Sequence, residues 1–206
     1  MANYFKSIGI QVGDCIAGLL PRTPELLITI LATWRIGAIY QPLFTAFESK
    51  AIEHRVLTAN TKLIVTNAEQ RPKLNHVEVK HILTVNAGTN LTSNEADFWQ
   101  EVKQQSDQYE AVLRSFDDDF LMMFTSGTTG LAKSVPVPLK AVLAFKGYMQ
   151  HAVDLREDDS FWNLADPGWA YGLYYGITGP LSLGHSIIMD ERASVSYTHL
   201  RAHETP

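Results

Sequence analysis

A chain of 206 residues, 46% of them hydrophobic, is long enough to form one large domain around a packed core. Its net charge of −5 excludes non-specific nucleic-acid binding, which needs a basic face. No apolar stretch reaches the roughly 18 residues of a membrane-spanning helix, and no secretory signal is recognisable. The only cysteine, Cys15, cannot form an internal disulfide and lies in an apolar run, so we expect a buried thiol. A cytoplasmic protein without a membrane span is therefore expected.

The first 70 residues predict strands and helices in alternation. Apolar runs at residues 14–20, 38–43 and 62–66 predict strands, and helical spacing predicts helices after Thr23 and over 48–59. Thr23-Pro24-Glu25 has the form of an N-cap followed by proline and an acid in the first turn. The first of these helices is expected to bury Leu27, Ile30, Leu31 and Trp34. This rhythm predicts an α/β fold with mostly parallel sheets flanked by helices.

The remaining elements are less regular. Strands are predicted over 81–85, 120–125, 160–165 and 183–189, and helices over 96–105, 139–153 and 171–178. Residues 87–95 are expected to form a loop and residues 115–119 a solvated turn, while Val135-Pro136-Val137 receives no assignment. The segment 194–206 has no apolar period and resembles translated sequencing-adapter read-through. We expect it to be a non-native or disordered tail, so its two histidines are left out of site reasoning.

A polar loop after the apolar strand carries the strongest chemical signal. It combines two glycines, which allow close backbone approach, with four hydroxyls and one cation. Successive N–H groups in such a bend form an anion-binding nest that suits a polyphosphate. The residues are Thr125, Ser126, Gly127, Thr128, Thr129, Gly130 and Lys133. The pattern is neither a Walker P-loop nor a dinucleotide fingerprint, and on composition alone an ordinary surface loop remains the alternative.

The literal string Thr-Ser-Gly-Thr-Thr-Gly-x-x-Lys is similar to the phosphate loop of the adenylate-forming superfamily. The resemblance extends over about residues 3–193, through segments 13–21, 24–25 and 37–43. Segment 165–172, Ala-Asp-Pro-Gly-Trp-Ala-Tyr-Gly, resembles the Ala-Asp-x-Gly-Trp segment of acetyl-CoA and medium-chain acyl-CoA synthetases. Two departures stand in the loop: Ala132 occupies the usual proline position, and Ser134 stands where glycine or alanine is common. The branch implied is that of AMP-forming acyl-CoA synthetases.

The resemblance implies a reaction and a set of site residues. A carboxylate attacks the α-phosphate of ATP, and the thiol of coenzyme A then attacks the acyl-adenylate. The loop residues named above would hold the β- and γ-phosphates, with Mg²⁺ bridging phosphate oxygens and Lys133 as the catalytic cation. Trp169, Ala170 and Tyr171 would line the substrate pocket, with core packing as the alternative for Trp169. Asp166 is expected to order its turn rather than touch substrate. No histidine has metal-ligand spacing, so no protein metal site is assigned.

The family's later motifs and its C-terminal lid with a catalytic lysine do not appear in the sequence. Residues 1–193 are therefore expected to be part of the N-terminal AMP-binding domain of an acid-thiol ligase of fatty acid metabolism that activates a short or medium aliphatic carboxylic acid, and to be inactive alone. Two other readings stay open: a non-catalytic nucleotide- or phosphate-binding module, and a generic α/β domain whose glycine loop is structural. The partners implied are a small carboxylic acid, ATP and coenzyme A. The sequence does not specify the acid or the oligomeric state.

Overall fold

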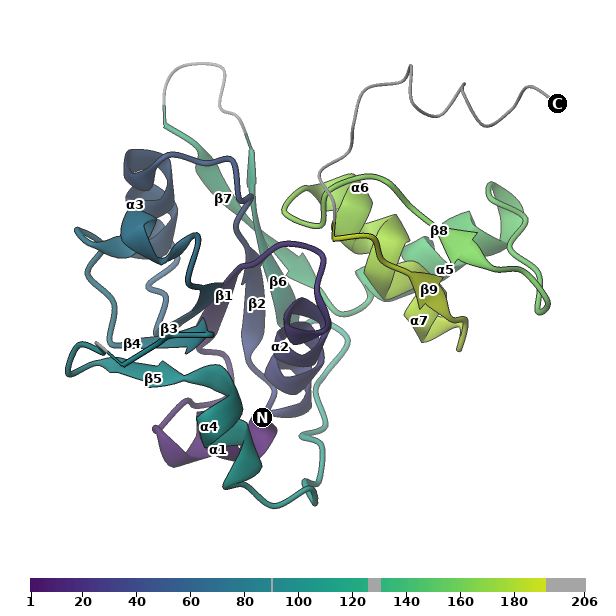
Figure 1. Ribbon diagram of the computed structural model, residues 1–206. Helices are drawn as coiled ribbons and strands as arrows, with labels where there is room; N and C mark the ends of the chain where they lie inside the picture. The colour runs from purple at the N-terminus through teal and green to yellow at the C-terminus, as the bar shows by residue number, and fades with distance from the viewer. Residues whose placement is uncertain (90, 126–130, 192–206) are drawn as a thin grey trace, which may run out of the picture.

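The computed structural model describes residues 1–89, 91–125 and 131–191. Within these ranges its larger part is a seven-stranded sheet in the order β5-β4-β3-β1-β2-β6-β7 (Figure 1). The pairs from β5 through β6 are parallel, and β6 pairs antiparallel with β7. The strands are β1 (Cys15–Leu19), β2 (Ile39–Pro42), β3 (Leu63–Asn67), β4 (His81–Val85), β5 (Glu95–Asp97), β6 (Asp119–Thr125) and β7 (Lys133–Pro138). The mostly parallel sheet expected from the sequence is confirmed.

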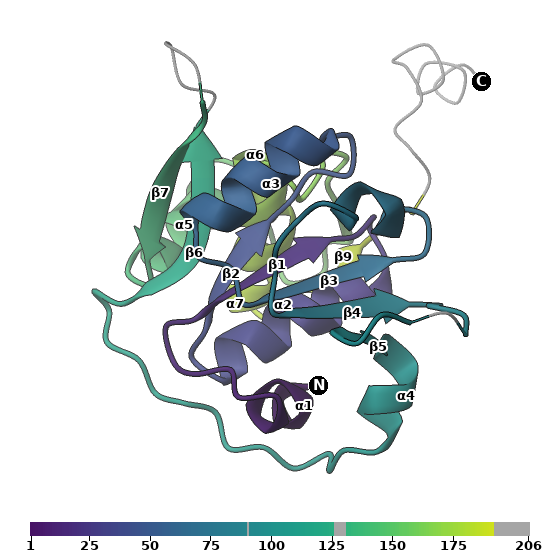
Figure 2. The same ribbon diagram turned by 90° about the vertical axis from the view of Figure 1, so that its left-hand side faces the viewer.

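Helices cover both faces of this sheet. Helix α2 (Pro24–Arg35) lies on one face, and α3 (Ser49–Thr58) lies on the other, as Figures 1 and 2 show from two directions. The short η1 (Arg71–Leu74) contacts α3, while α1 (Ala2–Ser7) contacts α2. Helix α4 (Phe98–Lys103) contacts β4 and β5, and its N-cap Asp97 accepts a hydrogen bond from the Gln100 N–H. Both faces of the sheet are therefore covered, as a parallel sheet requires.

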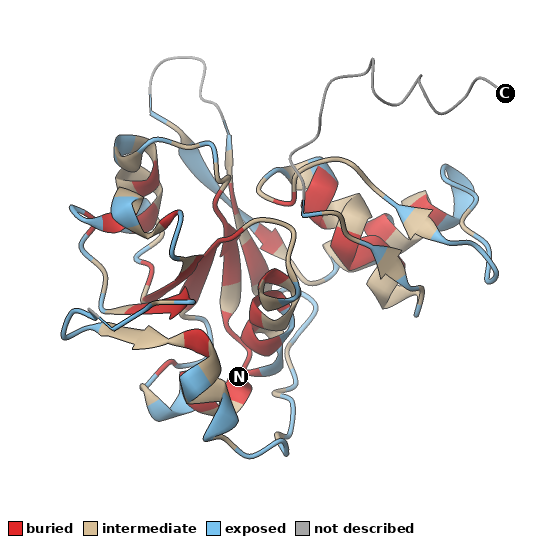
Figure 3. Ribbon diagram, in the orientation of Figure 1, coloured by how far each residue is buried: buried red, intermediate tan, exposed pale blue. Residues whose placement is uncertain are grey.

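Two apolar clusters, one for each face of the sheet, form the core (Figure 3). Strand residues enter them alternately because successive side chains of a strand point to opposite faces. The cluster on the α2 side contains Ile16, Leu26, Ile30, Leu63, Val65 and Leu83. The cluster on the α3 side contains Ala17, Leu19, Ile52, Val56, Ile64 and Ile82. The continuous burial of β1 and β3 explains why their sequences read as unbroken apolar runs.

A smaller helical unit follows the sheet. It consists of α5 (Ala141–His151), α6 (Ala170–Leu173), the π-helical η2 (Tyr174–Thr178) and α7 (Gly179–Ser182). The last three elements are continuous from residue 170 to residue 182, so the helical segment is longer than the helix predicted over 171–178. Beside them lies a two-stranded parallel pair, β8 (Phe161–Trp162) and β9 (Ile187–Ile188) (Figure 1). Phe145 of α5 stacks on Tyr174 with ring centroids 4.4 Å apart, which joins α5 to η2.

Helix α2 buries Ile30 as predicted and packs Leu27 and Trp34 against the core, but the prediction for Leu31 is wrong. Leu31 is 41% exposed, whereas Thr29 and Thr33 are fully buried. The buried threonines are tolerated because each hydroxyl donates to the carbonyl four residues earlier, Thr29 to Glu25 and Thr33 to Thr29, both at 2.7 Å. The sequence reading counted only apolar side chains and so missed a helix face built partly from threonine.

Two strands were not predicted. β7 contains Pro136 and Pro138, in a segment that received no assignment from the sequence, and it pairs with β6 alone at one end of the sheet order, where proline is tolerated. β5 lies at the opposite end of the order, within the segments read as a loop and a helix.

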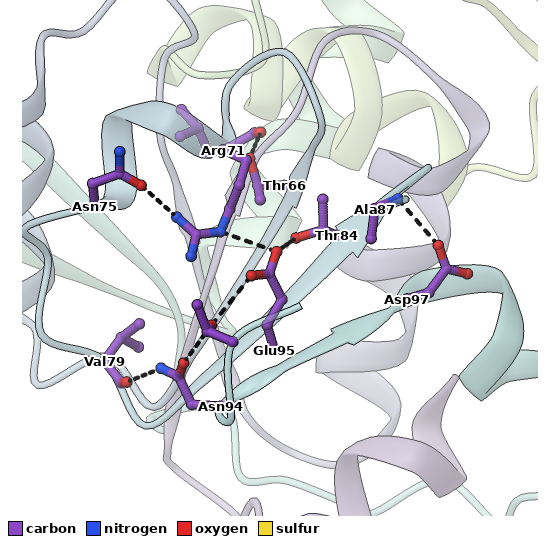
Figure 4. Close-up of polar contacts among 11 residues, drawn as sticks. Thr66, Arg71, Asn75, Val79, Thr84, Ala87, Asn94, Glu95 and Asp97 are labelled. Atoms are coloured by element: carbon purple, nitrogen blue, oxygen red, sulfur yellow. Dashed lines mark hydrogen bonds and ion pairs between the residues drawn. The ribbon is translucent and has the colours of Figure 1, made fainter. Parts of the chain in front are cut away.

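Polar contacts attach β5 to the rest of the fold (Figure 4). Arg71 Nε donates to Glu95 Oε1 at 3.0 Å, and Thr84 Oγ1 donates to the same oxygen at 2.6 Å. Burial pushes the pKa of Glu95 upward, but the hydrogen bonds from Thr84 and Arg71 and the charge of Arg71 outweigh it, so the pKa lies below its ordinary value. This network joins η1, β4 and β5.

Candidate active site

The predicted phosphate loop connects two adjacent antiparallel strands. Thr125 is the last residue of β6 and Lys133 the first of β7, and the two are register partners. Both are exposed. The predicted loop residues between them, Ser126, Gly127, Thr128, Thr129 and Gly130, lie outside the described residues. Their assignment to phosphate therefore stays a prediction, while the two strand ends that flank them are defined.

A cavity of about 190 Å³ lies beside the end of β6. Three of the predicted site residues line it: Thr125, Trp169 and Ala170. Its other walls are mostly apolar or aromatic and come from β2, β6, β7, η2 and the segment after β2. They include Pro42, Phe47, Met123, Phe124, Val135 and Tyr174. Segments more than 40 residues apart in the chain thus meet where β6 leads into the predicted loop.

Trp169 packs against the segment that follows β2. Its ring centroid lies 5.5 Å from that of Phe44 and 5.6 Å from that of Phe47. The side chain nevertheless stays 45% exposed, and it lines the cavity. Aromatic packing and cavity lining, which the sequence left as alternatives, are therefore both present at this residue.

The turn that carries Trp169 is tightly built. The Gly168 N–H donates to Asp166 Oδ1 at 2.7 Å, so the expectation that Asp166 orders the turn is confirmed. Burial raises the pKa of Asp166, and the Gly168 hydrogen bond and the charge of Arg22 oppose the shift. A Cβ on Gly168 would lie 2.6 Å from the Cα of Phe44, so only glycine allows this approach. The close approach brings Trp169 onto Phe44.

Tyr171 does not join this cavity. It is 51% exposed, and its hydroxyl oxygen lies 3.5 Å from that of Tyr148 on α5. Its ring also contacts Tyr175 at 5.1 Å between centroids. The structure therefore brings together two of the three predicted pocket residues and directs the third toward α5.

Arg55 is a cavity residue that the sequence reading missed. Its guanidinium carbon lies 4.1 Å from the centroid of Phe47 and 5.7 Å from that of Phe124, and its Nη1 donates to Ala51 O at 2.8 Å. Burial lowers the pKa of this guanidinium, and no ion pair to a described carboxylate is formed. The site thus contains a cation held between aromatic rings. A lone arginine on an amphipathic helix gives no sequence signal for such a position.

A second, larger cavity lies on the other side of the Phe44 segment. Its volume is about 560 Å³, and it is lined by Pro21 and Arg22 after β1, Phe44 to Ala46 after β2, and Glu69 and Gln70 after β3. These are the carboxyl ends of the parallel strands. The chain turns from β1 to α2 on one face and from β3 to η1 on the other, so the cavity opens at a topological switch point. Ligands of open α/β sheets bind preferentially at such points.

Comparison with known proteins decides the family. The family model described as AMP-binding enzyme matches residues 1–203. This chain belongs to the AMP-binding enzyme family. Acetyl-coenzyme A synthetase from Deinococcus radiodurans is 33% identical over 93% of the chain and 33% of its own length. The Bacillus subtilis acetyl-coenzyme A synthetase is 33% identical over 86% of the chain and 32% of its own length. The chain therefore spans about a third of the length of these curated relatives.

Solved structures agree with this assignment. An acyl-CoA synthetase from Brucella canis superposes with a TM-score of 0.91 at 52% identity, covering 98% of this chain and 38% of that protein. An anthranilate CoA ligase solved with anthranoyl-AMP gives a TM-score of 0.88 at 20% identity, covering 97% of this chain and 39% of that protein, which shows the shared fold. In the described part of the chain, no helix combines the length and apolar character needed to cross a bilayer.

Proposed function

We propose that this AMP-binding chain forms the phosphate- and acid-binding part of an ATP-dependent acyl-CoA synthetase. The observation that carries the proposal is the cavity in which Thr125, at the entry of the glycine loop, meets Trp169 and Ala170. An adenylate-forming enzyme must bring a carboxylate to the α-phosphate of ATP, so its acid pocket has to open beside its phosphate loop. Because the chain spans about a third of its relatives, the proposal concerns the complete protein that contains it.

The proposed reaction has two steps. The carboxylate oxygen attacks the α-phosphorus of ATP and pyrophosphate leaves, which gives an acyl-adenylate. The coenzyme A thiol then attacks the acyl carbon and AMP leaves with the bonding electrons. In this scheme the loop donors from Thr125 to Gly130 bind the β- and γ-phosphates, and Lys133 neutralises the charge of the departing pyrophosphate.

Mg²⁺ belongs to this scheme as a neutralising ion on the phosphate oxygens of ATP. Among the described residues, no group of histidine, cysteine and acidic side chains is arranged to hold a metal ion. We therefore assign no protein ligand to it and derive no step from it.

The acid is proposed to be short. The cavity beside Thr125 has about 190 Å³ and mostly apolar walls, which favours a small aliphatic or aromatic carboxylic acid over a long acyl chain. The relatives named acetyl-coenzyme A synthetases support the same size class. The larger cavity is proposed to admit part of coenzyme A. Its thiol must approach the acyl group near Trp169, and Phe44, which lines this larger cavity, packs against Trp169. A cytoplasmic location remains part of the proposal, on the sequence features given above.

The test is pyrophosphate release by the complete protein with ATP, Mg²⁺, coenzyme A and acids of increasing chain length. We expect activity that is highest with short acids and falls as the chain lengthens. Lys133→Ala should lower kcat/KM for ATP by about 10²-fold, the scale for losing one preorganised charge. Lys140→Ala is the matched control because Lys140 forms only an exposed ion pair with Asp117. ATP binding without acid-dependent pyrophosphate release would favour the non-catalytic module instead.

A further inference from the structure

The described end of β7 that follows the predicted loop has a single neighbouring strand, β6. β7 lies at the end of the strand order, and its first four residues, Lys133 to Pro136, are exposed. β6 pairs with β2 at Tyr40 and Leu121, four residues before Thr125. Holding exposed residues in a single conformation costs conformational entropy, and few packing contacts offset that cost at an exposed strand end. Beyond its pairing with Thr125 of β6, any further restraint on Lys133 has to come from another element.

Such a contact comes from α3. His54 Nε2 lies 2.8 Å from the carbonyl oxygen of Ala132, the residue immediately before Lys133. A carbonyl oxygen can only accept, so Nε2 carries the proton of this hydrogen bond. The two residues are 78 positions apart in the sequence. The contact thus ties the exit of the loop to a helix on the face of the sheet.

The helix is a firm support for this contact. Ile52 and Val56, on either side of His54, are fully or almost fully buried in the core cluster on that face. Their packing fixes the backbone from which the imidazole extends, while the imidazole itself stays half-buried at the hairpin. Ala132 has no side-chain ring to restrict its own φ angle, so the peptide before Lys133 depends on outside contacts for its orientation.

We infer that His54 is a positioning residue for Lys133: its Nε2–H holds the Ala132 carbonyl and so sets the direction in which the lysine leaves the strand. This inference rests on the proposed role of Lys133 toward the phosphates of ATP. His54 does not touch the reacting atoms in this scheme. Its effect is transmitted through a single peptide group, and a displacement of about 1 Å in a catalytic group is enough to slow a reaction substantially.

The test compares three variants of the complete protein in the pyrophosphate-release assay. His54→Leu removes the donor at similar size, whereas His54→Gln retains an N–H at a similar reach. Leu57→Gln changes an exposed residue of the same helix and serves as the control. We expect His54→Leu to lower kcat/KM for ATP about three- to tenfold, the scale of one hydrogen bond, with KM for the acid unchanged. His54→Gln should recover most of the loss, and Leu57→Gln should behave as wild type.

A double variant separates positioning from general stability. In the Lys133→Ala background, His54→Leu should cause no further loss, because the residue that it positions is absent. Independent, multiplicative losses would overturn the inference, as would a Leu variant equal to wild type or a Gln variant as poor as Leu. A fall in thermal midpoint that accounts for the loss of activity would overturn it too. Wild-type protein without acid-dependent pyrophosphate release would instead refute the proposed function itself.

Discussion

Gly172 offers a direct test of how the Trp169 turn is built. It lies buried in α6 against the backbone of that turn. A Cβ at this position would stand 2.7 Å from Ala165 O and closer still to the Asp166 carbonyl. Both contacts are to backbone, which cannot rotate away. The methyl group would lie roughly 0.8 Å inside the ~3.5 Å optimum for non-bonded atoms at Ala165 O and further inside it at the Asp166 carbonyl, so the turn or the helix must move. Overpacking of this kind lowers the free energy of unfolding by about 1–3 kcal/mol. The higher helix propensity of alanine offsets at most about 1 kcal/mol of this loss, so Gly172→Ala should destabilise the protein.

The matched control is Gly147→Ala. Gly147 is also helical, in α5, but a Cβ there meets nothing within 4 Å. We expect this change to stabilise the protein by about 0.5–1 kcal/mol, because alanine loses less backbone entropy than glycine. Urea denaturation of both variants of the complete protein, followed by tryptophan fluorescence, measures the contrast. Gly172→Ala should also reduce synthetase activity, since it displaces Trp169. Equal midpoints for Gly172→Ala and wild type would refute the packing argument.

Three further predictions follow from buried or paired groups. Cys15 is 4% exposed and burial raises its pKa to about 12, so a thiol reagent at pH 8 should label it only after unfolding; fast labelling of the native protein would contradict this. The pKa of Glu95 is lower in the folded protein than its ordinary value of 4.5. The ionised Glu95 therefore stabilises the fold above pH 4.5, and this stabilisation is lost as the pH falls from 4.5 through the folded-state pKa. In denaturation curves between pH 6 and pH 3, Glu95→Gln should therefore lose less stability on acidification than wild type, and equal slopes would argue against it. Arg55→Met should cost about 0.5–2 kcal/mol in urea denaturation through the lost cation–π contact with Phe47, whereas Lys50→Met, at an exposed position of the same helix, serves as its control.

Local patterns predicted most of the sheet. The strands from β1 to β4 and β6 are buried and rich in apolar residues, so their positions follow from short apolar runs. The missed strands owe their pairing to non-local contacts. β5 is a polar tripeptide whose Glu95 is paired by Arg71, 24 residues away, and β7 tolerates Pro136 because only one neighbour pairs with it. Neither condition is visible within a window of a few residues.

In the candidate site, as in the sheet, some residues follow from contiguous motifs and others are placed by contacts between distant segments. The glycine loop and the Asp166 turn follow from contiguous residues, and Asp166 does order its turn as expected. The orientation of Tyr171 away from the cavity depends on α5, which supplies Tyr148 as a neighbour. The contributions of Arg55 and His54 depend on where α3 lies relative to the β6–β7 hairpin. Sequence reasoning therefore predicts the residues of a contiguous motif more readily than the residues that packing brings beside it.

This division has a physical basis that bears on the mechanism. A short polar string can supply the donors for a polyphosphate, but an exposed hairpin end cannot fix their direction, because a β-hairpin alone is only marginally stable in water. The sheet fixes β6 through Leu121, and α3 reaches the other end of the loop through Ala132. Electrostatic stabilisation of a departing pyrophosphate is large only when the charge is already oriented before the reaction. The catalytic role proposed for Lys133 should thus depend on a helix that is distant in sequence, and the paired substitutions at His54 and Lys133 measure this dependence.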